Sequence, residues 1–100
     1  MAITRSEAAR LALQLANRTW GYPSAGEELV ILEDWVVESD SAWAFTYNTR
    51  SFVETGDVMR ALGVGNGPII VVKSSGAVHQ MPSAYSAREA LRVWDKAEWD

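Results

Sequence analysis

Residues 63–72, GVGNGPIIVV, constrain the fold of this chain more than any other stretch. Residues 65–67 (Gly-Asn-Gly) adopt positive φ at low cost, as a tight turn requires. Pro68 lacks a backbone N–H and therefore suits the first residue of a strand rather than its middle. Ile69–Val72 are all β-branched, which favours a pleated, buried strand. We therefore expect a turn that leads into a central strand, on which the other elements pack.

Capping signals predict a helix near each end of the chain. Thr4 and Glu7 match a capping box, and the apolar residues behind them recur at helical spacing, which predicts a helix over about residues 5–18. Ser86 and Glu89 form a second capping box, which predicts a last helix from about residue 87 to near the C-terminus. The length of 100 residues suits one domain, residues 1–100.

Two hairpins are expected between these helices. Residues 29–37 and 42–48 predict one antiparallel hairpin, in which the first strand has a polar break at Glu33-Asp34. Residues 68–73 and 77–81 predict the second hairpin, with a turn at Ser-Ser-Gly between them. Strands that follow one another as hairpins form antiparallel sheets.

The segment between the hairpins is expected to hold a short extended piece and a short helix. Residues 51–56 read as an extended edge piece, and Asp57 can cap one or two helical turns that end at Gly63. The expected fold is therefore α+β and two-layered. Its antiparallel sheet has four strands, or five with the edge piece, and the N- and C-terminal helices lie on one face.

The strand pattern leaves a question about the second face of the sheet. Residues 29–37 and Ile69–Val72 are apolar on both faces, whereas a two-layer domain exposes one face to water. A loop, a second copy of the chain or a partner protein could cover that face. The segment over residues 51–62 and the loop before the first strand are covers from within the chain.

Composition argues against several classes of function. The net charge of −4 is unfavourable for nucleic-acid binding. The absence of cysteine excludes disulfides and thiolate metal sites, and a single histidine, His79, makes a zinc site improbable. The glycine run does not match G-x-G-x-x-G in spacing or context. We therefore expect no enzyme, no catalytic residue, no cofactor and no metal.

The N-terminal stretch has Glu7 and Arg10 within it, so it is typical of a soluble helix rather than a signal peptide. No run approaches the roughly 18 apolar residues of a membrane span. We expect a cytoplasmic protein.

The acidic residues and tryptophans supply candidates for partner binding. Residues 27–40 hold six acids and no Lys or Arg, which favours a basic partner surface, although a solvated acidic hairpin fits as well. Trp35, Trp43 and Trp94 fall on predicted core faces. Trp20 and Trp99 lie at helix ends, where they either pack on the sheet or serve as exposed anchors. The candidate partner-binding residues are Glu33, Asp34, Glu38, Asp40, Trp20 and Trp99.

The centre of the chain resembles the immunity protein 35 family of YrhB-like proteins. The resemblance covers about residues 28–95, and the N-terminal helix is consistent with it. It rests on four motifs that stand in the family's order: WAFTYN from Trp43, ETGD from Glu54, GNGPIIV from Gly65 and GAVH from Gly76.

The resemblance implies a small bacterial α+β protein that is encoded beside a polymorphic toxin and neutralises that toxin by binding it. The family's motifs look structural, so they assign no toxin-binding residue.

Three functions are therefore carried forward. The first is an immunity protein that blocks a toxin sterically. The second is a chaperone-like holdase, or a general interaction module, that uses the apolar second sheet face. The third is a small-molecule-binding or enzymatic domain, for which His79 is the most plausible catalyst. A symmetric dimer and a monomer both fit.

Overall fold

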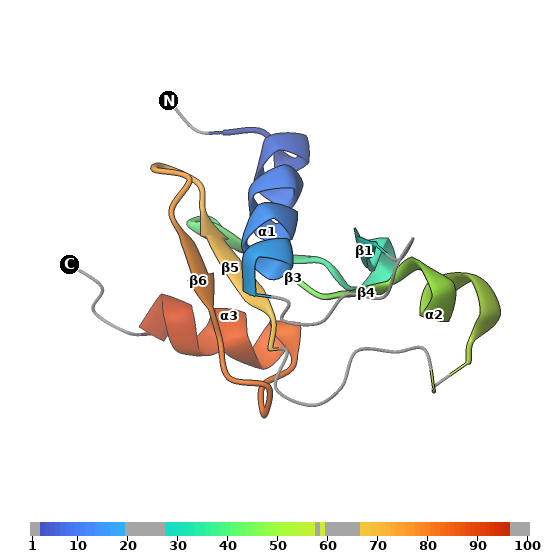
Figure 1. Ribbon diagram of the computed structural model, residues 1–100. Coiled ribbons are helices and arrows are strands. Elements are labelled where there is room, and N and C mark those ends of the chain that lie inside the picture. The colour runs from blue at the N-terminus through green and yellow to red at the C-terminus, as the bar shows by residue number, and fades with distance from the viewer. Residues whose placement is uncertain (1–2, 20–27, 58, 60–66, 97–100) are drawn as a thin grey trace.

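The computed structural model describes residues 3–19, 28–57, 59 and 67–96 (Figure 1). Helices lie at both ends and strands between them, so the expected α+β class and the two terminal helices are confirmed. The elements in chain order are α1 (Arg5–Thr19), β1 (Leu29–Ile31), the 3₁₀ turn η1 (Glu33–Trp35), β2 (Val37–Glu38), β3 (Ala42–Phe45), β4 (Tyr47–Thr49), α2 (Arg50–Thr55), β5 (Ile69–Val72), β6 (Val78–Gln80) and α3 (Ala87–Lys96).

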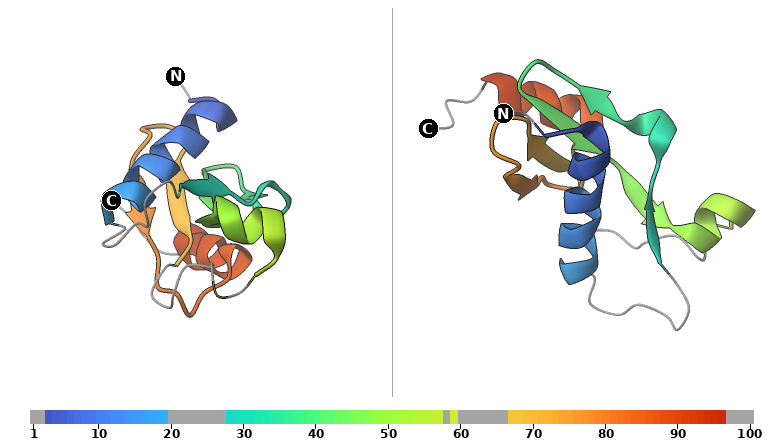
Figure 2. Two further views of the ribbon diagram at one scale, coloured as in Figure 1. Left: turned by 45° about the vertical axis from the view of Figure 1, so that its right-hand side comes forward. Right: turned by 90° about the horizontal axis from the view of Figure 1, so that it is seen from above.

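The strands form two antiparallel sheets. Four strands lie in the order β2-β3-β5-β6, with β5 between β3 and β6, as expected of the central strand. The other sheet is a two-stranded ribbon of β1 and β4. This ribbon and α2 extend from one side of the four-stranded sheet (Figures 1 and 2).

The ribbon arises because the first predicted hairpin is divided in two. Its halves pair antiparallel as expected, but Ile31 pairs with Tyr47 whereas Val37 pairs with Ala44. The first strand thus advances six residues while the second advances three. The three additional residues form η1, at the position of the predicted polar break. An insertion of this kind bends a strand and moves its two halves into different sheets.

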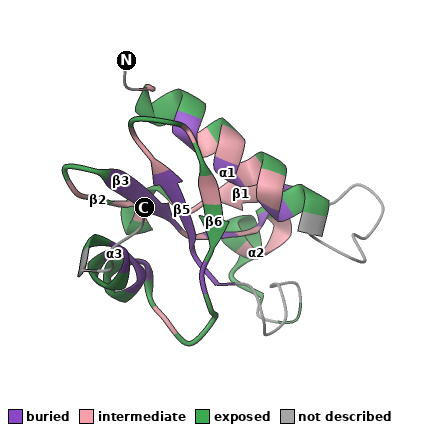
Figure 3. Ribbon diagram, turned by 90° about the vertical axis from the view of Figure 1, so that its left-hand side faces the viewer, coloured by how far each residue is buried: buried purple, intermediate pink, exposed green. Residues whose placement is uncertain are grey.

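The two terminal helices cover opposite faces of the four-stranded sheet, so the expectation that both lie on one face is wrong (Figure 3). Helix α1 packs through a ridge of small residues, and α3 packs on the other face. The α1 core contains Ala8, Ala12, Ala16, Trp43, Phe45, Ile69 and Val71, among others. The α3 core contains Ala42, Ala44, Ile70, Met81, Ala87, Ala90, Leu91 and Trp94.

The expected two layers are therefore wrong, and the three-layer arrangement answers the question of the second face. Successive side chains of β3 and β5 point to opposite faces, and both sets are apolar. Each face therefore needs a cover, and α3 of the same chain covers the second one. Burial of β3 and β5 therefore requires neither the segment over residues 51–62 nor a partner protein.

The expectation of an extended piece over residues 51–56 is wrong, because this segment forms α2. The segment therefore does not add a fifth strand to the sheet either. The Thr49 hydroxyl caps the helix by accepting a hydrogen bond from the Phe52 N–H at 3.1 Å. Gly56 ends the helix in the left-handed region at φ 73°. The Asp57 carboxylate accepts the Met59 N–H at 3.0 Å, but most of the predicted helix after Asp57 lies outside the described residues.

The second capping box is confirmed by its hydrogen bonds, whereas the expectation of a positive φ at Gly67 is wrong. In the second capping box, Ser86 and Glu89 each accept the other's backbone N–H at 3.2 Å. Gly67 leads into β5 and is needed there for space, because a Cβ at this position would lie 1.8 Å from the Met81 carbonyl oxygen of the same chain. Residues 63–66 of the glycine run lie outside the described residues.

Candidate partner-binding surface

The η1 turn presents Trp35 to solvent. The Trp35 N–H bonds the Leu32 carbonyl at 3.0 Å, and the Val36 N–H bonds the Glu33 carbonyl at 3.4 Å. None of the three residues of the turn is buried, and Trp35 is 66% exposed. The expectation that Trp35 belongs to the core is therefore wrong, whereas Trp43 and Trp94 are buried as expected. If the predicted strand over residues 29–37 had continued without the η1 insertion, the Trp35 side chain would have pointed to the core face of that strand.

Trp35 borders a groove on the side of α2. Its volume is about 490 Å³. Phe52 and Val53 of α2 form one wall, and the β1 end and η1 form the other. Val53 is 49% exposed, so both walls present apolar surface to water. We call this the α2 groove, and its lining residues are Ile31, Leu32, Glu33, Asp34, Trp35, Phe52, Val53 and Gly56.

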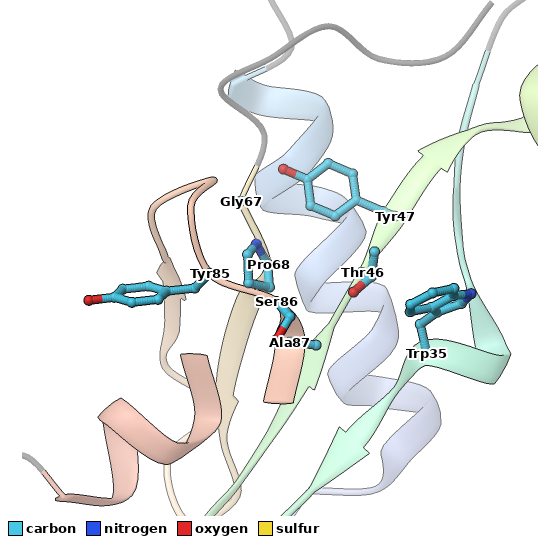
Figure 4. A pocket seen from close by; sticks show the side chains of 8 residues that line it. All are labelled: Trp35, Thr46, Tyr47, Gly67, Pro68, Tyr85, Ser86 and Ala87. Atoms are coloured by element: carbon cyan, nitrogen blue, oxygen red, sulfur yellow. The ribbon is translucent and has the colours of Figure 1, made fainter. Parts of the chain in front are cut away.

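Two smaller hollows separate Trp35 from the start of α3. One, of about 320 Å³, runs from Asp34 to Arg88. The other, of about 180 Å³, has the Trp35 indole on one side and Ser86 and Ala87 on the other (Figure 4). Trp35 is thus bordered by open space both toward α2 and toward α3.

The four acidic candidates differ in their partners. Glu33 pairs with Arg5 at 2.9 Å, and Glu38 pairs with Lys73. Asp34 and Asp40 are exposed and form no ion pair with any described residue. The hydrogen bond from Lys73 is the main reason why the pKa of Glu38 lies below its ordinary value.

The structure does not bring these four acids into one cluster. Glu33 and Asp34 line the α2 groove, and the hollow beside Asp34 reaches Arg88 in the first turn of α3. The turn that holds Asp40 lies near the other end of α3, since the hydroxyls of Ser39 and Ser41 donate to Asp95 at 3.2 and 2.8 Å. Arg88 and Asp95 are seven residues apart, or about 10 Å along the helix. Trp20 and Trp99 lie outside the described residues.

Of the residues that line the α2 groove, the sequence predicted Glu33 and Asp34 as candidates, but not Trp35, Phe52 or Val53. The signal for α2 was present, because Thr49 and Gly56 are a suitable cap and end for a short helix. For Trp35 the signal was the polar pair before it, which marks an interruption of the strand.

His79 lies on β6, where its ring contacts that of Trp94 with centroids 4.8 Å apart. Within the described ranges, no group of three or more His, Cys, Asp or Glu residues is placed to hold a metal ion. No described helix is both long and apolar enough to cross a membrane.

The profile of the family described as Immunity protein 35 matches residues 6–97. The chain therefore belongs to the immunity protein 35 family, and the resemblance seen in the sequence is confirmed. It is also similar to the uncharacterized protein YrhB of Escherichia coli (strain K12), at 38% identity over 53 residues. That alignment covers 53% of this chain and 55% of YrhB, so the chain spans about half the length of this relative. No solved structure matches the chain significantly.

Proposed function

We propose that this protein is an immunity protein that neutralises a cognate bacterial toxin by binding it directly. Membership of the immunity protein 35 family is the observation that carries this proposal. To block a toxin by occlusion, the protein needs only a surface that is complementary to the toxin. The exposed, acidic η1 turn, which carries Trp35, is a candidate for part of that surface. The proposal also includes a cytoplasmic location.

We assign the acidic residues to the recognition of a basic toxin surface. Asp34 and Asp40 are available to new cations, because neither has an ion pair among the described residues. Glu33 can exchange its present partner, because both members of its pair with Arg5 are exposed and such pairs are weak. Glu38 is also exposed, although its partner Lys73 is mostly buried. Acids of this kind speed association and exclude wrong partners more than they add affinity. Trp20 and Trp99 stay as proposed anchors.

The test is binding of the purified protein to the catalytically inactive product of the neighbouring toxin gene. We expect a stable one-to-one complex, and protection of growth when the active toxin is expressed. Alanine at Glu33, Asp34, Glu38 and Asp40 together should weaken the complex about tenfold or more and flatten its salt dependence. Unchanged affinity and salt dependence would show that the acids lie outside the interface.

A chaperone-like function is the second candidate. Its original motivation, an uncovered second sheet face, does not hold because α3 covers that face. The exposed side chains of Trp35, Val53 and Met59 now favour it instead, since a holdase needs accessible apolar surface. Suppression of aggregation of unrelated unfolded proteins, without a defined complex with the toxin, would support this function over immunity.

A further inference from the structure

The α2 groove combines an apolar interior with an acidic rim. Ile31, Leu32 and Phe52 are partly buried and line the groove together with the exposed Trp35 and Val53. The volume of about 490 Å³ is within the usual range for ligand pockets and leaves room for one large apolar side chain.

The charged residues that the structure describes in the lining of this groove are acidic. Two of its lining residues, Glu33 and Asp34, are acidic, and none of the other lining residues that the structure describes is basic. Arg5 already pairs with Glu33, whereas Asp34 has no ion-pair partner in the part of the chain that the structure describes. A cation beside Asp34 would therefore meet an uncompensated carboxylate at the edge of an apolar pocket.

The fold itself does not require Trp35 at this position. The turn that carries it is an insertion into the hairpin, with no buried residue, and the cores under α1 and α3 do not include it. An exposed tryptophan beside an apolar groove is a frequent arrangement at binding hot spots, where a partner side chain fills the groove and excludes water.

We propose that the α2 groove is the main contact site for the toxin and takes one large apolar side chain next to a Lys or Arg on the toxin surface. The apolar side chain packs between Trp35 and Val53, and the cation pairs with Asp34. This inference rests on the proposed function for the identity of the partner. The charge of the rim fits a basic protein rather than a second copy of this acidic chain, whose net charge is −4.

The experiment compares two valine substitutions in the full-length protein, with the inactive toxin as the probe. Val53→Asp places a charge in the groove, and Val93→Asp places the same charge on α3, where Val93 is 38% exposed and lines none of the three hollows around Trp35. We expect Val53→Asp to raise Kd at least tenfold and Val93→Asp to change it less than twofold. Equal Kd for Val53→Asp and the wild type overturns the inference and leaves the proposed function intact.

Trp35→Ala is the second variant, in case Val53→Asp fails to fold. Because Trp35 is mostly exposed, we expect the unfolding midpoint to stay near that of the wild type and Kd to rise at least tenfold. Asp34→Asn should slow association at low salt without a comparable change in dissociation. Wild-type affinity in a folded Trp35→Ala variant overturns the inference, and failure of the wild type to bind the inactive toxin overturns the proposed function together with it.

Discussion

At the scale of single residues, Gly67 shows how close backbone approach restricts the sequence. A Cβ at this position would lie 1.8 Å from the Met81 carbonyl oxygen, and this oxygen belongs to backbone that pairs with the start of β5. The Gln80 side chain also donates to the Gly67 carbonyl. The glycine is therefore required here for space.

We predict that Gly67→Ala lowers the free energy of unfolding by about 2 kcal/mol or more, because the backbone must move to relieve the clash. Gly56→Asn is the matched control. Gly56 has φ 73° with no atom within 4 Å of a Cβ, and asparagine tolerates that conformation, so its loss should stay below about 1 kcal/mol. Urea unfolding of the two variants makes the comparison, and equal losses would contradict the account of Gly67.

The Glu38–Lys73 pair predicts a pH dependence. The pKa of Glu38 in the folded protein lies below the ordinary value of 4.5, chiefly because of the hydrogen bond from Lys73. Folding therefore favours the carboxylate, and its contribution is present above about pH 4.5 and is lost as the pH falls through the folded pKa.

The prediction is that the wild type is more stable than Glu38→Gln at pH 7 and that this difference shrinks below pH 4.5. Denaturant unfolding at several pH values measures it. Lys73→Met serves as the control, because Glu38→Gln in that background should show a much smaller difference at neutral pH. If the stability difference between the wild type and Glu38→Gln were the same at pH 3 as at pH 7, the Glu38–Lys73 ion pair would not be its cause.

At the scale of elements, α2 depends on its cap because it has six residues and none is buried. Thr49 is 3% exposed and its hydroxyl accepts the Phe52 N–H. Loss of this cap should loosen the wall of the α2 groove that Phe52 and Val53 form.

Thr49→Ala should therefore cost about 1 kcal/mol of stability and accelerate amide hydrogen exchange in α2 more than in β5. Thr49→Ser keeps the capping hydroxyl and should restore most of the protection. Uniform loss of protection across α2 and β5 would indicate that Thr49 acts on the whole fold and not on this helix.

The elements also show which features the sequence can predict. Local signals predicted the terminal helices and β5, because capping boxes and β-branched runs act within a few residues. Trp35 could not be placed in the same way, since its exposure depends on a three-residue difference between the two sides of the first hairpin, which the pairing of the strands sets and not the residues next to Trp35. For the candidate surface, the sequence predicted Glu33 and Asp34 but not the groove beside them.

At the scale of the whole molecule, the decisive feature is a sheet covered on both faces. Apolar residues on both sides of β3 and β5 were visible in the sequence, but the identity of the second cover was not. Helix α3 satisfies this need, with Leu91 4% exposed over Ala44 and Ile70 in the same core. The acidic Trp35 turn then lies outside both cores.

We predict that Leu91→Ala lowers the free energy of unfolding by about 2–5 kcal/mol, because it removes a buried side chain between α3 and the sheet. Calorimetric or urea unfolding measures the loss. Leu32→Ala is a suitable control. Leu32 is only partly buried at the α2 groove, so its substitution should lower the free energy of unfolding by less. Equal costs would mean that α3 is not the main cover of the second face.

Toxin binding is tested by light scattering of the purified protein, alone and mixed with the inactive product of the neighbouring toxin gene. We predict a complex with the mass of one copy of each chain, which Val53→Asp weakens and Val93→Asp leaves intact. No complex with the toxin, together with suppressed aggregation of unrelated unfolded proteins, would contradict the immunity function and support the chaperone-like one.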